Sequence, residues 1–391
     1  MFITQISENI AFQYFLGFIL WQVLYYFLSQ YINFSFQNSH HIKKNLHLFF
    51  VFLSIIAVVR IFYNVLPITS DSFLYLTKAS GIMAGDSYDV FGSGIYSYII
   101  ALVELLVFKN IYVVIFLNVT IFLIGIMEVI KQIPDYEKRD LSVFFLLLFI
   151  YPAIIWFIPN ILREAIFFLC IVKTYKYSQT ILAEEYLSKS VFKLFIFSSI
   201  AIIIRTQVLP ILMLWFVYLA FKKNYKFAIF PTLVLLILFF TTPLKDEYLR
   251  KISFDYIQAY KNEASSGLGF IAYTDLIVPE NITQLIQSMP MLLMRFVLSP
   301  FPWNLTYMQY TFAYIDALYV LTIVLMLVYR ILKNQIWSWS LIIFVMIFLI
   351  TFGVFEIAFT GAARHRMTFI ILLIPLVIPS YRLRDTNENK I

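Results

Sequence analysis

Charged side chains are scarce in this chain of 391 residues. Lys, Arg, Asp and Glu together make up 13% of the sequence, against 62% hydrophobic residues, and the mean hydropathy is +0.85. A soluble protein of this size leaves too much surface in water to be covered by so few polar side chains. The composition therefore excludes an ordinary soluble domain and favours a protein whose surface faces lipid.

Cysteine and histidine are also rare, and the common cofactor-binding motifs are missing. Cys170 is the single cysteine and lies inside an apolar run, which excludes an intramolecular disulfide and a cysteine-based metal site. The four histidines, two of them adjacent at His40 and His41, lack the spacing of zinc ligands. The P-loop, dinucleotide-binding, HExxH and GxSxG patterns are absent from the sequence. We therefore predict no metal site from the residues alone.

Apolar runs dominate what is present, and they are helical in character rather than alternating, which disfavours a β-barrel. The first run follows no basic segment and precedes no small-residue cleavage site, so we expect it to be a retained helix. With no linker or internal repeat, we predict one all-α transmembrane domain over residues 1–391. About eleven membrane-crossing helices are predicted, near residues 10–28, 47–66, 112–130, 141–158, 161–178, 193–204, 208–221, 227–242, 311–331, 337–353 and 367–381.

Basic residues are grouped in every second connection between these runs. The net charge of +7 arises from these groups, and not from one basic face of the kind that binds nucleic acid. Placing all of them in the cytoplasm follows the positive-inside rule and predicts an outer N-terminus and an inner C-terminus. The groups are Lys43 and Lys44; Lys131, Lys138 and Arg139; Lys173, Lys176, Lys189 and Lys193; Lys222, Lys223 and Lys226; Arg330 and Lys333; and Arg382, Arg384 and Lys390.

Two outer loops are large in this topology, at about residues 67–111 and 243–310. The first contains an apolar piece at 95–108 that is too short to cross and carries Glu104. We interpret that piece as a juxtamembrane or re-entrant helix. The second loop is mixed polar and aromatic, which suits a segment in the interfacial aromatic belt.

Acidic residues of the first loop are candidates for proton transfer. Asp71 directly follows a predicted helix, and Asp86 and Asp89 follow in the sequence GDSYD. A carboxylate just outside a bilayer is placed to accept a proton from a sugar hydroxyl. The structural alternative is that Ser70 or Asp71 caps a helix beginning there, and that the other two carboxylates shape a turn.

Arginines recur at the outer ends of predicted helices, where the positive-inside rule disfavours them. A lipid-linked phosphate or diphosphate would account for them, because guanidinium groups bind phosphate oxygens in bidentate geometry. His365 lies between two of them and suits a hydrogen-bonding role as a neutral group. The alternative is contact with lipid headgroups, or pairing with Glu164, Glu104 or Glu356. The arginines are Arg163, Arg205, Arg295, Arg364 and Arg366.

The arrangement of these residues resembles the GT-C-type integral membrane glycosyltransferases, over most of residues 47–381. Asp71-Ser-Phe-Leu-Tyr75, then Gly85-Asp86 and Gly94-Ile-Tyr96, is similar to their first outer loop. Arg205 in IIIRTQVLP resembles their mid-chain arginine segment, and the Arg364-His-Arg366 triplet resembles an Arg-Tyr-Arg motif near their C-termini. LSPFPW at 298–303 resembles repeat-unit polymerases of surface-polysaccharide loci. Many of these enzymes carry a second acidic residue where this chain has Ser72.

The resemblance implies a function that residue patterns alone do not provide. It implies a transferase in the cell membrane that takes a sugar from a polyprenyl phosphate or diphosphate at the periplasmic or outer face. Asp71 would be the base, and the arginines with His365 would bind phosphate, while Asp86, Asp89 and Glu104 would be secondary acids. A divalent metal stays open as a cofactor. The alternatives are a polymerase of O-antigen or capsule repeat units and, in another class, a transporter or flippase of lipid-linked sugars. A transporter should place paired charges deep within the membrane.

Overall fold

The structure, a computed structural model, describes residues 10–63, 70–88, 93–106, 110–183, 187–222, 281–301, 309–356 and 358–378. Its regular elements are fourteen α-helices and two short 3₁₀ helices within these ranges, which confirms the predicted all-α class. The chain divides into two compact units. Unit 1 comprises Met1–Phe145, Ile154–Leu169 and Tyr381–Ile391, and unit 2 comprises Leu146–Ala153 and Cys170–Ser380.

Five of the described helices are long and apolar enough to cross a membrane, so we describe the chain as an integral membrane protein. Shorter apolar helices cover Gly94–Leu106, Thr206–Lys222 and Trp339–Val354. The total of about eleven crossings stays a prediction, because the run near 227–242 and most of the loop at 243–310 lie outside the described residues. The five candidate spans are Tyr14–Ser35, His40–Arg60, Tyr112–Ile130, Thr311–Leu332 and Phe359–Val377.

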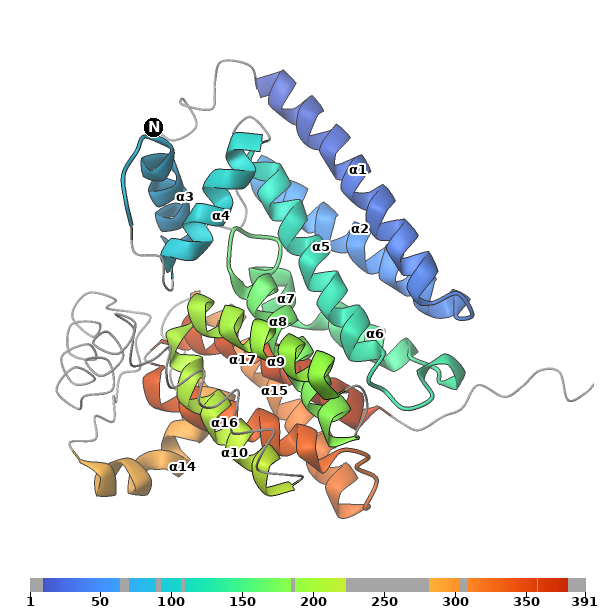
Figure 1. Cartoon of the computed structure of the whole chain (residues 1–391), viewed down its shortest axis with the longest axis vertical. Coiled ribbons are helices and arrows are strands. Elements are labelled where there is room, and N and C mark those ends of the chain that lie inside the picture. Colours follow the sequence, from blue (N-terminus) through green and yellow to red (C-terminus); the bar gives the residue numbers. More distant parts are fainter. Residues whose placement is uncertain are drawn as a thin grey trace, which may run out of the picture. The chain divides into compact units, whose positions relative to one another are not determined.

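Unit 1 is built around a helical hairpin. Helices α1 (Ile10–Ser35) and α2 (His40–Tyr63) both pack against α5 (Ile111–Ile130), as Figure 1 shows. Trp21 of α1 stacks on Phe50 of α2 and meets Phe116 of α5 edge-on, so aromatic contacts hold the three helices together. The side chain of Asn110 caps α5 by accepting the N–H of Tyr112 at 3.1 Å.

Two shorter helices follow α2 in the sequence and pack against each other. They are α3 (Ser70–Met83) and α4 (Ser93–Leu106), and α4 also contacts α5. Gly85 ends α3 with φ = +101°, a conformation that favours glycine, and the N–H of Asp86 returns to the Gly81 carbonyl at 2.9 Å. The predicted Gly-Asp turn is thus a helix C-cap, and the predicted short helix near 95–108 is α4.

The basic connections of unit 1 lie together at one end of the unit. Lys131, which follows α5, donates to the hydroxyl of Ser35 at the end of α1. His41, at the start of α2, lies 3.6 Å from Asp140 beyond the 3₁₀ helix Tyr136–Lys138. Arg60, in the last turn of α2, points instead to the segment around Pro159. Within this unit the connections after α1 and after α5 therefore lie together, and the side of the membrane that they face stays a prediction.

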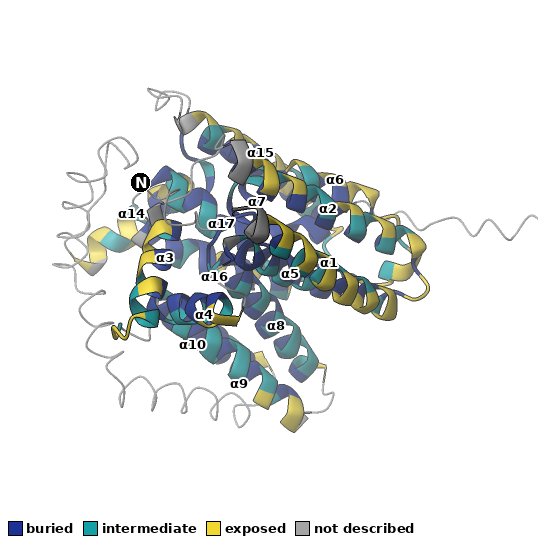
Figure 2. Ribbon diagram, turned by 90° about the horizontal axis from the view of Figure 1, so that it is seen from above, coloured by how far each residue is buried: buried dark blue, intermediate teal, exposed yellow. Residues whose placement is uncertain are grey.

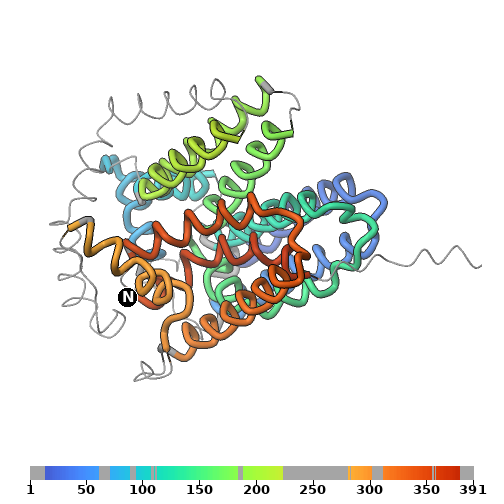
Figure 3. Tube along the Cα trace, turned by 90° about the horizontal axis from the view of Figure 1, so that it is seen from below, coloured from blue at the N-terminus to red at the C-terminus, as the bar shows by residue number. Residues whose placement is uncertain are grey.

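Unit 2 contains a core of buried helices. Helix α17 (Phe359–Val377) packs against α15 (Gln309–Leu332) and α16 (Trp339–Phe355), and α16 also packs against α10 (Leu209–Lys222) and α14 (Ile282–Leu298), as Figure 3 shows. Most of α17 is buried, whereas α15 exposes a row of large apolar side chains suited to lipid (Figure 2). Helix α9 (Leu187–Ile204) also belongs to unit 2. The residues of the remaining helices, α6 (Ser142–Ile150), α7 (Pro152–Phe157) and α8 (Glu164–Leu182), are divided between the two units.

Unit 2 also has a basic end and an opposite end. At the basic end, Tyr175 of α8 shares hydrogen bonds with Ser338 and Ser340 at the start of α16, close in sequence to Arg330 and Lys333. At the opposite end, α9 stops at Ile204 and the chain passes through the 3₁₀ helix Thr206–Val208 into α10. Arg205, which lies between α9 and this 3₁₀ helix, is close enough to His365 of α17 to act on it electrostatically.

Candidate functional site

Three of the predicted phosphate-binding residues meet at this end of unit 2. Arg205 occupies the break between α9 and α10 in extended backbone (φ −140°), as predicted, and its side chain is only 2% exposed. Arg364 and His365 lie near the start of α17 and are partly exposed. Both guanidinium groups are close enough to act electrostatically on the imidazole. The break between α9 and α10 carries Arg205, and the start of α17 carries His365. These two residues thus lie close to each other although 160 positions separate them in the sequence.

Glu356 completes this cluster from the C-terminal cap of α16. Its Oε2 lies 2.6 Å from Nδ1 of His365, and its Oε1 accepts the backbone N–H of Ala358 at 3.2 Å. Burial alone would raise the pKa of Glu356, but His365, the Ala358 amide and Arg364 hold it below its ordinary value. The carboxylate is therefore ionised at neutral pH.

Gly361 makes room for that carboxylate. A Cβ atom at this position, in the first turn of α17, would collide with the carboxylate oxygens of Glu356. The glycine of the GAARHR segment is therefore a packing requirement of the Glu356–His365 contact. We refer to Arg205, Glu356, Arg364 and His365 as the unit 2 cluster. Arg205 and Arg364 both act electrostatically on His365, and Arg364 also acts on Glu356.

Arg366 differs from its two neighbours. It is fully buried: Nε and Nη2 both donate to Oδ2 of Asp316 in α15, at 2.9 and 2.5 Å. Its Nη1 donates to the carbonyls of Phe296, Val297 and Ser299, at 2.9, 2.9 and 3.1 Å. Each nitrogen is thus bonded to protein, and the guanidinium fastens α17 to α15 and to the end of α14.

This geometry corrects two sequence interpretations. Arg364, His365 and Arg366 were expected in the last outer loop, but all three lie in α17, because that helix already begins at Phe359. The sequence also placed Arg366 at the outer end of a predicted helix, as a candidate phosphate ligand. Arg366 joins Asp316 as a paired charge inside two candidate spans. Burial of the pair is tolerated because each partner neutralises the other.

Asp71, the predicted base, lies in unit 1. It occupies the first turn of α3 and is partly exposed. The helix begins at Ser70, where the sequence placed it, and a carboxylate in the first turn favours the helix dipole. The structure thus agrees with the expected helix start at this point and leaves the catalytic role of Asp71 a prediction.

Ser72, next to Asp71, is fully buried and ties α3 to another segment of unit 1. Its hydroxyl lies 2.9 Å from Oδ1 of Asn160 and 3.0 Å from the carbonyl oxygen of Ile161. Both are acceptors, so an acidic residue here would place a buried negative charge against two oxygens. Ser72 also fixes the backbone that carries Asp71.

Unit 1 extends this contact into a network of uncharged groups that the sequence analysis missed. Asn118 of α5 donates to the carbonyls of Asn160 and Leu162, at 2.7 and 3.1 Å. The hydroxyl of Tyr96 in α4 donates to Oδ1 of Asn118 at 3.2 Å. The sequence did contain a signal for this network, namely the amide of Asn118 inside the apolar run IYVVIFLNVTIFLIG. A polar side chain within a membrane span usually has a hydrogen-bond partner, so this residue indicated a buried polar contact. We call Ser72, Tyr96, Asn118 and Asn160 the unit 1 network.

Arg60 borders this network and was not among the predicted site residues. It is 3% exposed and donates to the carbonyl oxygens of Trp156 and Pro159, at 2.8 and 3.2 Å, with its guanidinium over the Trp156 ring. The contacts hold the segment that carries Asn160 against the end of α2. Arg60 therefore stabilises the segment that contains Asn160 and Ile161, which accept the hydrogen bonds of Ser72.

The other predicted residues are dispersed. Arg163 precedes α8 and is partly exposed, and Glu104 is buried in α4. Arg295 lies in the last turn of α14, where its carbonyl accepts the N–H of Ser299. Asp86 is exposed in the turn after α3, and Asp89 lies outside the described residues. The structure thus brings Arg205, Arg364 and His365 together but does not place Asp71 relative to them.

The comparisons with known proteins found no relative. No family model, no curated protein and no solved structure matches the chain. The resemblance to GT-C enzymes therefore stays a prediction from sparse residues, and function has to be argued from the contacts described above.

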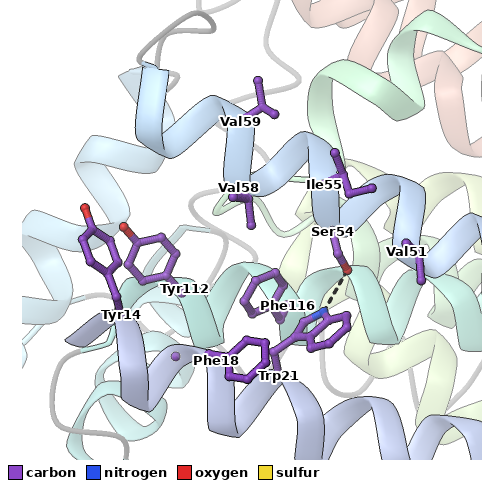
Figure 4. A pocket seen from close by; sticks show the side chains of 11 residues that line it. Tyr14, Phe18, Trp21, Val51, Ser54, Ile55, Val58, Val59, Tyr112 and Phe116 are labelled. Carbon is purple, nitrogen blue, oxygen red and sulfur yellow. Dashed lines mark hydrogen bonds between the residues drawn. The ribbon is translucent and has the colours of Figure 1, made fainter. Parts of the chain in front are cut away.

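Two further features bear on what the chain can bind. Among the residues that the structure describes, no three His, Cys, Asp or Glu side chains lie together as metal ligands would. A cavity of 410 Å³ lies between α1, α2 and α5, and its lining is apolar and aromatic. Figure 4 shows Trp21 at its floor, with the indole N–H donating to the hydroxyl of Ser54. This cavity offers hydrocarbon contact and no charge for a phosphate.

Proposed function

We propose that this chain is a membrane glycosyltransferase of GT-C-like architecture, with about eleven crossings, that works on the outer face of the cell membrane. The donor is a sugar on a polyprenyl phosphate or diphosphate, and the product belongs to a surface polysaccharide such as O-antigen or capsule. The observation that supports this proposal most is the unit 2 cluster. It places two guanidinium groups beside an imidazole at the end of the unit away from its basic connections.

The chemistry requires such a group of cations. As the bond between the anomeric carbon and the phosphate oxygen breaks, the phosphate leaves with the electron pair and gains negative charge. Arg205 and Arg364 would stabilise that charge, and guanidinium is suited to it because it binds two oxygens at once. We do not assign this role to Arg366, since its nitrogens already bind Asp316 and three carbonyls.

The acceptor hydroxyl must lose a proton as it attacks the anomeric carbon, and we propose Asp71 as the base. Asp71 is partly exposed, and the buried hydroxyl of the adjacent Ser72 holds the backbone at this point. A base held in one position is more effective than a mobile one, because proton transfer needs hydrogen-bond distance. The proton passes to Asp71 and then to water.

The outer-face assignment is tested by accessibility in a Cys170→Ala background. Lys138 and Ser87 are both exposed and belong to the basic end and to the α3–α4 turn of unit 1, respectively. We expect a membrane-impermeant thiol reagent to label Ser87→Cys on intact cells and Lys138→Cys only after the membrane is opened. The reverse pattern would invert the topology and remove the site from the outer face.

The function itself is tested by the glycans of a strain that lacks the protein. We expect an undecorated or truncated polysaccharide repeat, with the unused polyprenyl-linked sugar accumulating on the outer leaflet. Unchanged surface glycans and unchanged lipid-linked intermediates would refute the proposal. Polysaccharide ladders that collapse to one repeat would instead identify a repeat-unit polymerase, for which the LSPFPW segment is the supporting observation.

A transporter or flippase of lipid-linked sugars is the second candidate, and one observation favours it. The Arg366–Asp316 pair is buried inside two candidate spans, where transporters place paired charges. The same deletion strain separates the two functions. A transporter's absence would leave the lipid-linked sugar on the inner leaflet, inaccessible to reagents added outside.

A further inference from the structure

The cavity of unit 1 lies at a depth where the surrounding medium is hydrocarbon. It measures 410 Å³ and is formed by α1, α2 and α5, each of which contains a candidate membrane span. Among the described residues it is only partly enclosed, because Phe18, Ile55 and Val59 in its lining are exposed. Residues of a membrane span face acyl chains where they are exposed. The open side of the cavity therefore faces lipid and not water.

The two ends of the cavity differ in chemistry. Tyr14 and Tyr112 form one end, with ring centroids 5.4 Å apart, and they are the first residues of two candidate spans. Tyrosine is common at that level because its ring lies among acyl chains while its hydroxyl reaches the lipid headgroups. Trp21 stacks on Phe50 of α2 at the other end (Figure 4), about two turns further along α1. The cavity thus runs from the membrane interface into the hydrocarbon core.

The wall between these ends offers only carbon to an occupant. The indole N–H of Trp21 already donates to the hydroxyl of Ser54 at 3.1 Å. The rest of the wall is aliphatic or aromatic, with Phe116 of α5 at its base, and no charged side chain is among the described residues that line it. A polar group inserted here would be buried without a partner. The part of a ligand that enters the cavity is therefore an unsubstituted hydrocarbon chain.

The size of the cavity indicates the kind of chain. A protein cavity of about 150 Å³ with an apolar lining binds benzene. In proportion to the carbons of benzene, 410 Å³ holds about sixteen carbons, the length of one common acyl chain. The chain of a polyprenyl lipid is several times longer and is branched, so most of it would stay outside. One straight acyl chain fits the volume better than an isoprenoid chain does.

We propose that this cavity binds one acyl chain of a bilayer glycerolipid, with the carboxyl end of the chain at Tyr14 and Tyr112 and the methyl end at Trp21. The bound chain fills the space between α1 and α2 and gives both helices dispersion contacts that an empty cavity lacks. The proposal needs only the membrane location of unit 1 and does not depend on the proposed glycosyl transfer.

Photolabelling of the full chain tests the proposal, in digitonin micelles, because the fused rings of digitonin are wider than one acyl chain. The probes are trace amounts of phosphatidylcholine with a diazirine near the methyl end or near the carboxyl end of one chain. Phe116 is buried at the base of the cavity, whereas Phe27 is exposed outside the lining and reports general contact with lipid. We expect the methyl-end probe to label Trp21 and Phe116 as strongly as Phe27. The carboxyl-end probe should label Tyr14 and Tyr112 instead.

Competition on the unaltered chain identifies the lipid. Dipalmitoylphosphatidylcholine should lower the label on Phe116 several-fold relative to the label on Phe27. Dioctanoylphosphatidylcholine should compete less well, because its shorter chains leave part of the cavity without contacts. A polyprenyl phosphate should compete weakly. If the polyprenyl phosphate displaces the probe better than the dipalmitoyl lipid does, the occupant is an isoprenoid chain and the proposal is wrong.

Two matched variants locate the bound chain. Val58 points toward Phe116 (Figure 4), so Val58→Phe places a ring inside the cavity, where a benzene ring takes about 150 Å³. The label on Phe116 should then fall several-fold relative to Phe27. Val23→Phe adds the same ring at an exposed position of α1 outside the lining and should leave the ratio unchanged. Labelling of Phe27 without Phe116 in the unaltered chain would overturn the proposal, and it is the result expected if a second copy or another segment of the chain covers the cavity.

Discussion

The two units differ in the kind of polar side chain that they bury in an apolar protein. The unit 1 network consists of hydroxyl and amide side chains, and it binds mainly backbone carbonyls of one segment. The unit 2 cluster contains the charged side chains of Arg205, Glu356 and Arg364 beside His365, and the Arg366–Asp316 pair adds two more charges. Neutral groups exert little electric field at a distance and mainly fix geometry, whereas full charges act on other charges at a distance.

The difference assigns separate tasks to the units. In unit 1, the uncharged side chains of the network fix the start of α3, which carries Asp71, and add no charge beside it. In the proposed reaction, unit 2 would supply the positive charge for the leaving phosphate through Arg205 and Arg364. Its most deeply buried charges, Arg366 and Asp316, neutralise each other. Substitutions in unit 1 should therefore act through position, and substitutions in unit 2 through charge.

The largest effect is expected for Arg366→Met, which leaves Asp316 buried without its partner. Breaking a buried ion pair from one side typically costs about 3–5 kcal/mol, because the remaining charge is uncompensated. We expect very little folded protein in membranes, measured as the monodisperse fraction after detergent extraction. The double variant with Asp316→Leu removes both charges and should recover much of the yield. Normal yield of Arg366→Met with lost phosphate binding would instead make Arg366 a ligand, as the sequence suggested.

Asp71→Asn should be the most damaging change to activity in unit 1. Asparagine preserves size and is an equally good residue at a helix start, but it does not accept a proton at neutral pH. Loss of a general base typically costs about 10²–10⁴-fold in rate. The measurement is glycan product in membranes with equal amounts of protein. Near-normal turnover would leave Asp71 a structural residue of α3, and Asp86 would be the next carboxylate to examine.

Lysine substitutions at Arg205 and Arg364 keep the charge of unit 2 but lose bidentate geometry. We expect each to weaken binding of a polyprenyl diphosphate by about tenfold to a hundredfold, the range of a charged hydrogen bond. Protein levels should stay normal. Arg330→Lys is the matched control, because Arg330 lies at the basic end of the same unit and binds Gln335. Equal losses in all three variants would indicate a general effect of arginine on stability.

Most of the fold could be predicted from hydropathy because a long apolar run in lipid has few alternatives to a helix. The runs near 10–28, 47–66, 112–130 and 311–331 each became one helix, and the short piece near 95–108 became α4. The run at 141–158 is interrupted instead, with α6 ending at Ile150 and α7 beginning at Pro152. Proline at a helix start is favourable and in a helix interior is not, so this break had a local signal.

The site was less accessible to sequence reasoning, for physical reasons. Arg205, Arg364 and His365 were found because charge is conspicuous in apolar sequence. The sequence did not reveal that Arg364 and Arg366 have different roles. Arg364 lies beside His365, whereas Arg366 binds Asp316, because the two arginines lie on different sides of α17. That distinction needs the start of the helix, which was placed too late. The unit 1 network was missed because its partners are backbone carbonyls, which every sequence has.

The smallest effect is expected for Ser72→Ala, and it tests the claim that unit 1 acts through position. The substitution removes one buried hydroxyl, while Asn160 keeps the N–H of Ile161 on its Oδ1 at 2.9 Å. Loss of such a bond costs about 1 kcal/mol, so the protein should still reach the membrane in normal amounts. If Ser72 holds Asp71 in place, turnover should fall by less than in Asp71→Asn, and the double variant should be no worse than Asp71→Asn alone. Two independent contributions would multiply in the double variant, and that result would separate Ser72 from the role of its neighbour.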